Sequence, residues 1–301
     1  MVGDGHIPGA KLLSMPELET SDGVRIWYQV RGSGPPVLAC QGGPATVSDT
    51  LAKTLTPLEN SYTVVYHDYR GSGRSQTAPA TTYTFERIAD DLNELRAHLS
   101  YERVSVLAHS MGGFIGLSYA LRHRRHCVGM VLVATTPTGR PAKIALPALR
   151  ALGPTRTVRA LALGAWYVAA WSWRRESTDK QTARYAAMAT TQEGAPLARG
   201  KVKALTGALP PNDNVPQLEK LFARTDLTDR LGEIRCPVLV LYGGRDAVMV
   251  VGGRLLARGL SDARTVCLPE VGHEPFIEDP KSAFPRVRSF LATLDYGRQC
   301  T

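Results

Sequence analysis

Short apolar runs alternate with segments of helical spacing along most of the chain. The runs that predict buried strands are 36–40, 62–66, 104–108, 127–134, 237–242 and 264–268. The segments that predict helices are 48–58, 84–99, 114–126, 253–260 and 281–294. Buried strands that alternate with helices are typical of a mostly parallel sheet with helices on both faces. The hydrophobic pattern therefore predicts the α/β fold class.

The segment before the first buried run has a different pattern. Polar and apolar residues alternate from Leu18 to Val30, and the segment ends in a turn rich in glycine and serine at 31–34. Period-two alternation is typical of a half-buried strand. We expect a hairpin-like pair of antiparallel strands at one edge of the sheet.

The alternation stops between residues 138 and 232. This segment contains no convincing strand, and 156–173 and 178–188 are expected to be helices. We interpret it as a helical lid inserted into a core formed by residues 1–137 and 233–301. Its apolar stretch 161–171 is expected to cover a substrate pocket or to pack on the core.

The stretch 104–113 (Val-Ser-Val-Leu-Ala-His-Ser-Met-Gly-Gly) joins a buried strand to a helix through small residues. A tight strand-to-helix turn leaves little room two positions on either side of its tip, and those positions are Ala108 and Gly112. Ser110 would then be exposed at the tip, where its hydroxyl can attack a substrate. In the alternative interpretation, Ser110 only caps the following helix.

A serine hydroxyl needs a positioned base to act as a nucleophile near neutral pH. The carboxyl ends of parallel strands share one crevice, so the partners of Ser110 should follow the later strands. Asp246 comes directly after the run 237–242, and His273 follows the last predicted strand. We predict that His273 moves the proton of Ser110 and that Asp246 orients His273.

Two backbone amides are candidates for an oxyanion hole. Pro44 has no N–H group, so the donor in the glycine-rich loop 41–45 should be Gly43. The second donor should be Met111, directly after the nucleophile. In the alternative interpretation, the glycine pair only forms a turn.

Three motifs, 41–45, 68–75 and 108–113, together resemble the α/β-hydrolase superfamily, and within it the proline iminopeptidase-like branch. The resemblance covers about residues 18–294 and includes the chain order Ser, Asp, His. It implies an α/β-hydrolase fold with an inserted lid, with Asp68 and Arg70 bracing the oxyanion loop. The first motif departs from the usual His-Gly-Gly-Pro-Gly at Gln41 and Ala45, so the exact specificity does not follow.

The net charge of +9 lies almost wholly in the predicted lid. Residues 138–232 contain 15 Lys and Arg against 7 Asp and Glu. An aminopeptidase must hold a cationic N-terminus, for which a basic lid is poorly suited. We therefore expect a neutral or anionic, largely apolar small molecule, which an acidic carrier could present. Equally, the basic residues could only be the solvated faces of lid helices. Candidate substrate contacts are Gln41, His109, Trp166 and Trp173.

Composition gives further expectations. The chain has no apolar run long enough for a membrane span and no N-terminal signal-peptide pattern. Its five cysteines are scattered, and the pattern favours small buried residues in a reducing compartment, so we expect a cytoplasmic protein. No metal site, cofactor or nucleic-acid partner is expected, and the oligomeric state stays open.

The predicted activity is that of a serine hydrolase. It would cleave an ester, lactone, thioester or amide through an acyl-enzyme. Three alternatives stay open: acyl transfer or cyclisation in secondary metabolism, a proline iminopeptidase-type aminopeptidase, and a ligand receptor that retains the triad.

Overall fold

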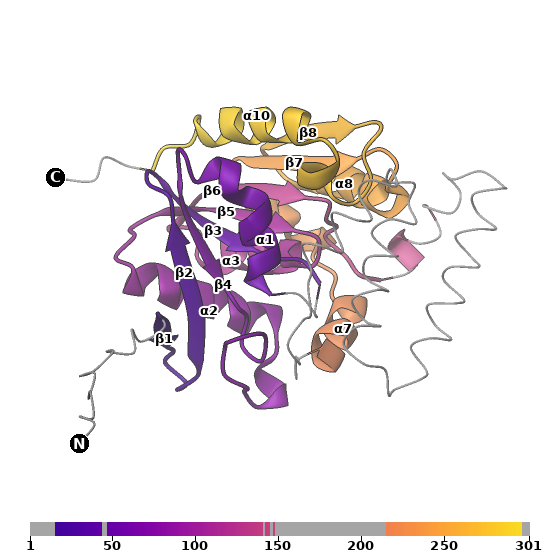
Figure 1. Cartoon of the computed structure of the whole chain (residues 1–301). Coiled ribbons are helices and arrows are strands. Elements are labelled where there is room, and N and C mark those ends of the chain that lie inside the picture. The colour runs from indigo at the N-terminus through magenta and orange to yellow at the C-terminus, as the bar shows by residue number, and fades with distance from the viewer. Residues whose placement is uncertain (1–15, 44–46, 141, 145–146, 148–214, 297–301) are drawn as a thin grey trace, which may run out of the picture.

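The centre of the protein is a sheet of eight strands (Figure 1). In the computed structural model, residues 16–43, 47–140, 142–144, 147 and 215–296 are described. The strands are β1 (Glu17–Glu19), β2 (Arg25–Arg31), β3 (Pro36–Cys40), β4 (Thr63–His67), β5 (Val104–His109), β6 (Cys127–Val133), β7 (Val238–Gly243) and β8 (Ala263–Leu268).

The sheet is mostly parallel, in the order β1-β2-β4-β3-β5-β6-β7-β8. β1 pairs with β2, and β2 with β4, in antiparallel register, whereas all other neighbours are parallel. The predicted fold class and the antiparallel edge hairpin are therefore confirmed.

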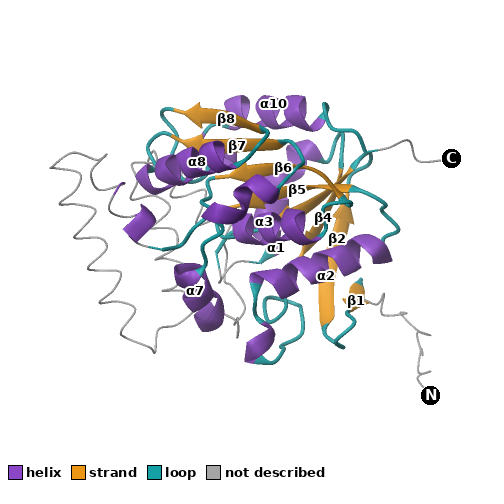
Figure 2. Ribbon diagram, turned by 180° about the vertical axis from the view of Figure 1, so that it is seen from behind, coloured by secondary structure: helices purple, strands orange, loops and turns teal. Residues whose placement is uncertain are grey.

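Helices cover both faces of the sheet. They are α1 (Ser48–Leu55), α2 (Phe85–His98), α3 (Gly112–Arg122), α7 (Val215–Arg224), α8 (Ala247–Gly259), α9 (Pro275–Glu278) and α10 (Pro280–Leu291). α1 and α10 lie on one face, and α2, α3 and α8 on the other (Figures 1 and 2). No helix in the described part of the chain is long and apolar enough to cross a membrane.

Local signals explain where several helices begin. The Thr84 side chain accepts from the Arg87 amide and caps α2, as predicted. α8 begins at Ala247, well before the predicted start at residue 253, because Asp246 caps it. Two positions inside this helix are glycines because there is no room for a side chain. A Cβ at Gly252 would collide with Thr135 and Thr136, and one at Gly253 would collide with the Tyr242 ring.

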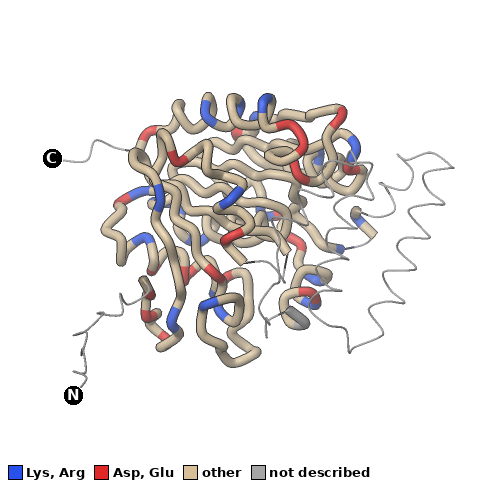
Figure 3. The backbone as a smooth tube through the Cα atoms, viewed as in Figure 1, with Lys and Arg blue, Asp and Glu red and all other residues tan. Residues whose placement is uncertain are grey.

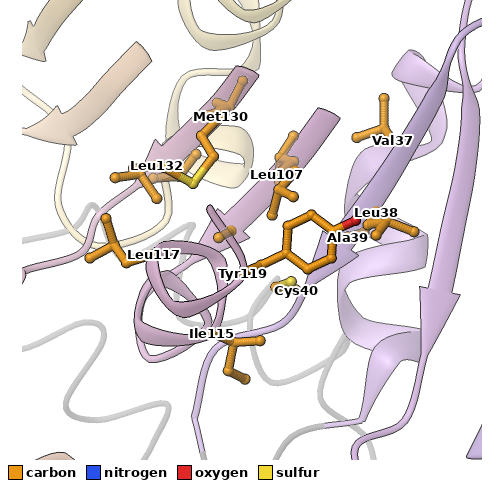
Figure 4. Packing of buried hydrophobic residues seen from close by; sticks show 14 of the residues in the cluster. Val37, Leu38, Ala39, Cys40, Leu107, Ile115, Leu117, Tyr119, Met130 and Leu132 are labelled. Atoms are coloured by element: carbon orange, nitrogen blue, oxygen red, sulfur yellow. The ribbon is translucent and has the colours of Figure 1, made fainter. Parts of the chain in front are cut away.

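The hydrophobic core is built on the central strands. All five residues of β3 are buried, and so are all residues of β5 and β6. Side chains of α3, such as Tyr119, pack near those of β3, β5 and β6 (Figure 4). This packing fixes the position of α3, and with it the turn that precedes α3.

The two ends of the predicted lid segment are joined by hydrogen bonds. The Gly139 amide donates to the Thr225 carbonyl at 3.0 Å, and the Leu227 amide donates to the Pro137 carbonyl at 2.8 Å. The chain thus leaves and re-enters the core at one place. The helices expected at 156–173 and 178–188 lie outside the described residues, so the lid stays a prediction.

The expectation that Cys267 is buried is wrong. Cys267 is exposed, although it lies in an apolar run. The reason is that β8 is an edge strand and most of its residues are at least partly accessible. An apolar run does not distinguish an edge strand from a central one.

Candidate active site

Ser110 lies in the turn between β5 and α3. Its φ is +53°, a left-handed conformation that costs a non-glycine residue about 1–3 kcal/mol. Two contacts hold it there: its amide donates to the Val133 carbonyl at 2.9 Å, and its carbonyl accepts from the Thr135 hydroxyl at 2.6 Å. Ser110 itself is partly exposed.

The small residues around Ser110 are required by close packing. A Cβ at Gly112 would lie 2.5 Å from the Cys40 carbonyl oxygen, and one at Gly113 would lie 2.0 Å from the Thr135 hydroxyl. On the other side, Ala108 is fully buried, and a Cβ at Gly116 would lie 3.0 Å from its methyl group. The sharp turn predicted from the sequence therefore forms.

His273 bridges the serine and an acid. Its Nε2 lies 3.0 Å from Ser110 Oγ, and its Nδ1 lies 2.6 Å from Asp246 Oδ2. The carboxylate can only accept, so in the neutral imidazole the proton is on Nδ1 and the Nε2 lone pair faces the serine hydroxyl. The other Asp246 oxygen accepts from the Met249 amide at 3.0 Å, which fixes the carboxylate at the start of α8.

The electrostatic surroundings favour the protonated form of His273. Burial lowers the pKa of its imidazole, but the hydrogen bond and charge of Asp246, with the charges of Glu274 and Glu278, outweigh burial. The net effect raises the pKa of His273 above its usual value. This surrounding charge stabilises an imidazolium, the species that forms when a base accepts a proton.

Glu278 holds the His273 loop on both sides, a contact that the sequence reasoning missed. Its carboxylate accepts from the Gly272 amide at 2.8 Å and from the Glu274 amide at 2.9 Å. The second bond resembles a capping box, in which a glutamate in the first helical turn reaches back to the N-cap amide. A glutamate soon after Pro275, which begins α9, was the available signal.

His109 packs against the same loop. Its Nε2 lies 3.1 Å from the His273 carbonyl oxygen and 3.7 Å from the Glu274 carboxylate. The ring is buried, and burial lowers its pKa, although the charge of Glu274 opposes this shift. These contacts involve the protein's own loop, and the predicted contact of His109 with substrate stays a prediction.

The glycine-rich loop lies directly against the nucleophile. A Cβ at Gly42 would lie 2.8 Å from the Ser110 Cβ, and Gly43 has a φ of +66°. Met111 is the N-cap residue of α3, where helix amides have no acceptor within the helix. Gly43 and Met111 thus stay the predicted oxyanion donors.

Gln41 is buried at the start of this loop, with 2% of its surface exposed. Its backbone carbonyl accepts from the Tyr69 hydroxyl at 2.8 Å. Neither polar atom of its side chain has a hydrogen-bond partner among the described residues. A buried amide without a partner costs about 1–3 kcal/mol, so this carboxamide is a candidate to bind a polar group of a ligand.

The motif 68–75 forms two separate ion-pair clusters. Asp68 accepts from the amide and hydroxyl of Ser48 and from the guanidinium of Arg74, which ties down the start of α1 after the oxyanion loop. Arg70, which was expected to brace the same loop, pairs with Asp22 and with Asp91 on α2. Asp68 therefore fixes the chain where it leaves the loop, and these pairs of Arg70 join α2 to the β1–β2 turn.

Some predicted features cannot be placed. Trp166 and Trp173 lie outside the described residues. Along the described trace, positive and negative residues are intermingled (Figure 3), and most of the basic 138–232 segment lies outside it. No group of three or more His, Cys, Asp or Glu among the described residues is arranged to hold a metal ion.

A model of the "alpha/beta hydrolase fold" family matches residues 35–280. The chain belongs to the α/β-hydrolase fold family. The match covers the sheet from β3 onward, the Ser110 turn, Asp246 and His273. The predicted superfamily is confirmed, whereas the iminopeptidase-like branch is supported only by distant similarity.

Members of several enzyme classes are similar to this α/β hydrolase. The proline iminopeptidase PfmaB of Pestalotiopsis fici is 25% identical over 285 residues, which cover 92% of this chain and 99% of that protein. A pimeloyl-[acyl-carrier protein] methyl ester esterase of Chromobacterium violaceum is 29% identical over 275 residues, with 90% and 99% covered. The crystal structure of a hydrolase from Pseudomonas aeruginosa PA01 has a TM-score of 0.70 at 26% identity, with 93% and 99% covered.

Proposed function

We propose that this α/β hydrolase is a serine hydrolase that cleaves an ester, lactone, thioester or amide bond of a small, largely apolar substrate. The observation that carries the proposal is the position of His273 between Ser110 Oγ (3.0 Å) and Asp246 Oδ2 (2.6 Å). Such a hydrogen-bonded chain converts a serine hydroxyl into a nucleophile.

The proposed reaction has two halves. Ser110 Oγ attacks the substrate carbonyl while His273 Nε2 takes its proton, and the amides of Gly43 and Met111 stabilise the oxyanion. His273 then protonates the leaving group, which leaves an acyl-enzyme on Ser110. In the second half, water attacks the acyl group with His273 again as base, and the acid is released.

The substrate proposal is a neutral or anionic acyl compound, and it rests on charge. Residues 138–232 hold 15 Lys and Arg against 7 Asp and Glu. One relative is a pimeloyl-[acyl-carrier protein] methyl ester esterase. The similarity to that esterase supports the idea of a carrier-bound substrate, because a basic segment attracts an acidic carrier.

An aminopeptidase of the proline iminopeptidase type is the second candidate, favoured by the similarity to the proline iminopeptidase PfmaB. It would need carboxylates to hold the free amino group of the substrate. Asp226, one of the seven acids in 138–232, is already paired with Lys143 at 2.7 Å and with Arg140 at 3.8 Å. The acyl-ester proposal is therefore preferred.

The first experiment is labelling with an activated fluorophosphonate, followed by peptide mapping, on the wild type and on Ser110→Ala and His273→Ala. We expect rapid labelling of Ser110, none in Ser110→Ala, and slow labelling in His273→Ala. Absence of labelling at Ser110 in folded wild-type protein would overturn the proposed mechanism.

A substrate panel then separates the candidates. It contains p-nitrophenyl esters, lactones, acyl-thioesters and prolyl-amides. Turnover of esters or thioesters with little on prolyl-amides supports the proposal, and the reverse supports an aminopeptidase. A steeper loss of kcat/KM with added salt for anionic than for neutral esters is expected if the basic segment attracts the substrate.

A further inference from the structure

Two cysteines that lie far apart in the sequence are in contact where the neighbouring strands β6 and β7 begin. The sulfur atoms of Cys127 and Cys236 are 3.8 Å apart, although the two residues are separated by 109 positions. The five cysteines are scattered along the sequence and no pairing was expected, and for these two that expectation is wrong. The contact arises because β6 and β7 are parallel neighbours, paired from Met130 and Val238 onward.

The surroundings of the two thiols differ. Cys127 is buried at the beginning of β6, whereas Cys236, just before β7, is partly accessible to solvent. Cys127 also approaches the Gly129 carbonyl oxygen at 3.7 Å. An oxidant from solvent would therefore reach Cys236 first, with a second thiol directly behind it.

We propose that Cys127 and Cys236 form a reversible oxidation site, in which a peroxide converts the dithiol into a disulfide. This proposal is independent of the serine hydrolase activity. It uses neither the triad nor any residue of 138–232.

The chemistry balances with one peroxide. The Cys236 thiolate attacks a peroxide oxygen and becomes a sulfenic acid, and hydrogen peroxide is reduced to water. The Cys127 sulfur then attacks the sulfenic sulfur, the S–S bond forms, and a second water leaves. Two thiols and one hydrogen peroxide thus give one disulfide and two waters.

The hydrogen bond between the thiols supports these roles. The hydrogen bond with Cys127 lowers the pKa of the Cys236 thiol, and burial opposes this effect only in part. The same bond, together with burial, raises the pKa of the Cys127 thiol. Cys236 is therefore the better nucleophile toward a peroxide, and Cys127 is the resolving thiol.

The bond would close a loop that contains the whole 138–232 segment. A disulfide stabilises mainly by restricting the unfolded chain, and the effect grows with loop length. The site lies at the start of β6, whereas the Ser110 turn contacts its far end at Val133, roughly 20 Å away along the strand. Oxidation should therefore raise stability and leave the Ser110 site unchanged.

The test uses reduced, folded, full-length protein treated with hydrogen peroxide. Remaining thiols are alkylated, and the protein is digested and mapped by mass spectrometry without reduction. We expect one cross-linked peptide pair that contains Cys127 and Cys236. The Tm should rise by about 5–10 °C, and dithiothreitol should reverse the rise. The rate of fluorophosphonate labelling at Ser110 should stay within about twofold.

Matched variants separate this pair from general thiol oxidation. Cys267→Ser removes an exposed cysteine outside the pair and should form the cross-link normally. Cys236→Ser should show neither the cross-link nor the Tm rise. Cys127→Ala should leave Cys236 as a sulfenic acid that dimedone captures. If the Cys127 variant does not fold, the wild-type protein oxidised in urea is the comparison, and there the pairing should be scrambled.

Two results would overturn the proposal. One is oxidation of Cys236 to sulfinic acid in folded wild-type protein without a cross-link to Cys127. The other is a cross-link that forms only in urea. Failure of Ser110 to react with fluorophosphonate would instead contradict the proposed function and would leave this result unaffected.

Discussion

The Ser110 site and the Arg70 cluster (Arg70 with Asp22 and Asp91) are both polar and largely buried. Both contain residues of the sequence motifs described above, but their charges are arranged differently. The Arg70 guanidinium is fully buried between the carboxylates of Asp22 and Asp91, with donor–acceptor distances of 2.6–3.1 Å. At the other site, a hydrogen-bonded chain starts at buried Asp246 and ends at the partly exposed hydroxyl of Ser110.

The difference separates a structural from a chemical role. Charges that are matched inside the protein stabilise the fold, and removal of one partner leaves another charge buried. A strained turn that holds a hydroxyl in line with a base and an acid keeps that hydroxyl available to react. Substitutions in the Ser110 site should therefore change activity, and substitutions of Arg70 or its partners should change stability.

The largest expected effect is that of Ser110→Ala. We expect kcat to fall on the order of 10⁶-fold because the proposed nucleophile is removed. The free energy of unfolding should change little, since alanine has the same backbone requirements. Ester hydrolysis and urea denaturation measure the two quantities, and Ser118→Ala, a buried serine on α3, is the control. Activity above about one per cent of wild type would exclude Ser110 as the nucleophile.

Asp246→Asn should lower kcat/KM by about 10⁴-fold while the cap of α8 is retained, because asparagine also caps helices. It should also change the pH profile. His273 must be neutral to accept a proton, and its pKa is raised, so wild-type activity should be lost as pH falls through that raised value. Without the carboxylate the pKa falls, so the acid limb of the residual activity should move to lower pH. An unmoved limb would show that Asp246 does not set the pKa of His273.

Arg70→Met should lower the free energy of unfolding by about 3–5 kcal/mol, because the buried Asp91 loses its buried partner and keeps the ion pair with the more exposed Arg87. Turnover per folded molecule should stay within about twofold of wild type. The control is Arg122→Met, which removes an ion pair with Asp90 in which the arginine is 44% exposed and should cost less than about 1 kcal/mol. A large drop in kcat of the folded Arg70 variant would contradict the separation of the two sites.

The smallest expected effect is that of Glu278→Gln. Glutamine retains one acceptor for the two amides beside His273, so we expect roughly a 10-fold lower kcat with little change in KM. The acid limb should also shift to lower pH, since the charge of Glu278 helps to raise the pKa of His273. Glu270→Gln, an exposed residue of the same loop, should have neither effect. A loss of stability without the pH shift would indicate a purely structural contact.

Much of this fold could be predicted because its strands are central and continuous. The apolar runs at 36–40 and 127–134 correspond to β3 and β6, whose residues are all buried. The strand ends also predicted that Ser110, Asp246 and His273 meet, and they lie within hydrogen-bond distance. Their catalytic role stays a prediction for the experiments above.

The missed features depend on contacts between distant segments. The exposure of Cys267 follows from the edge position of β8, and the partners of Arg70 lie 48 and 21 positions away. Hydropathy does not encode which strand is at an edge or which carboxylate meets a buried guanidinium.

The sequence by itself determined the order of strands and helices, the fold family and the three residues of the proposed triad, because periodicity and small-residue turns are local properties of a chain. Only the tertiary structure decided that Glu278 brackets His273, that Arg70 joins α2 to the β1–β2 turn, and that the sulfurs of Cys127 and Cys236 lie 3.8 Å apart. The physical reason is that these contacts depend on which elements pack together and in what register. Packing and register are properties of the whole folded chain.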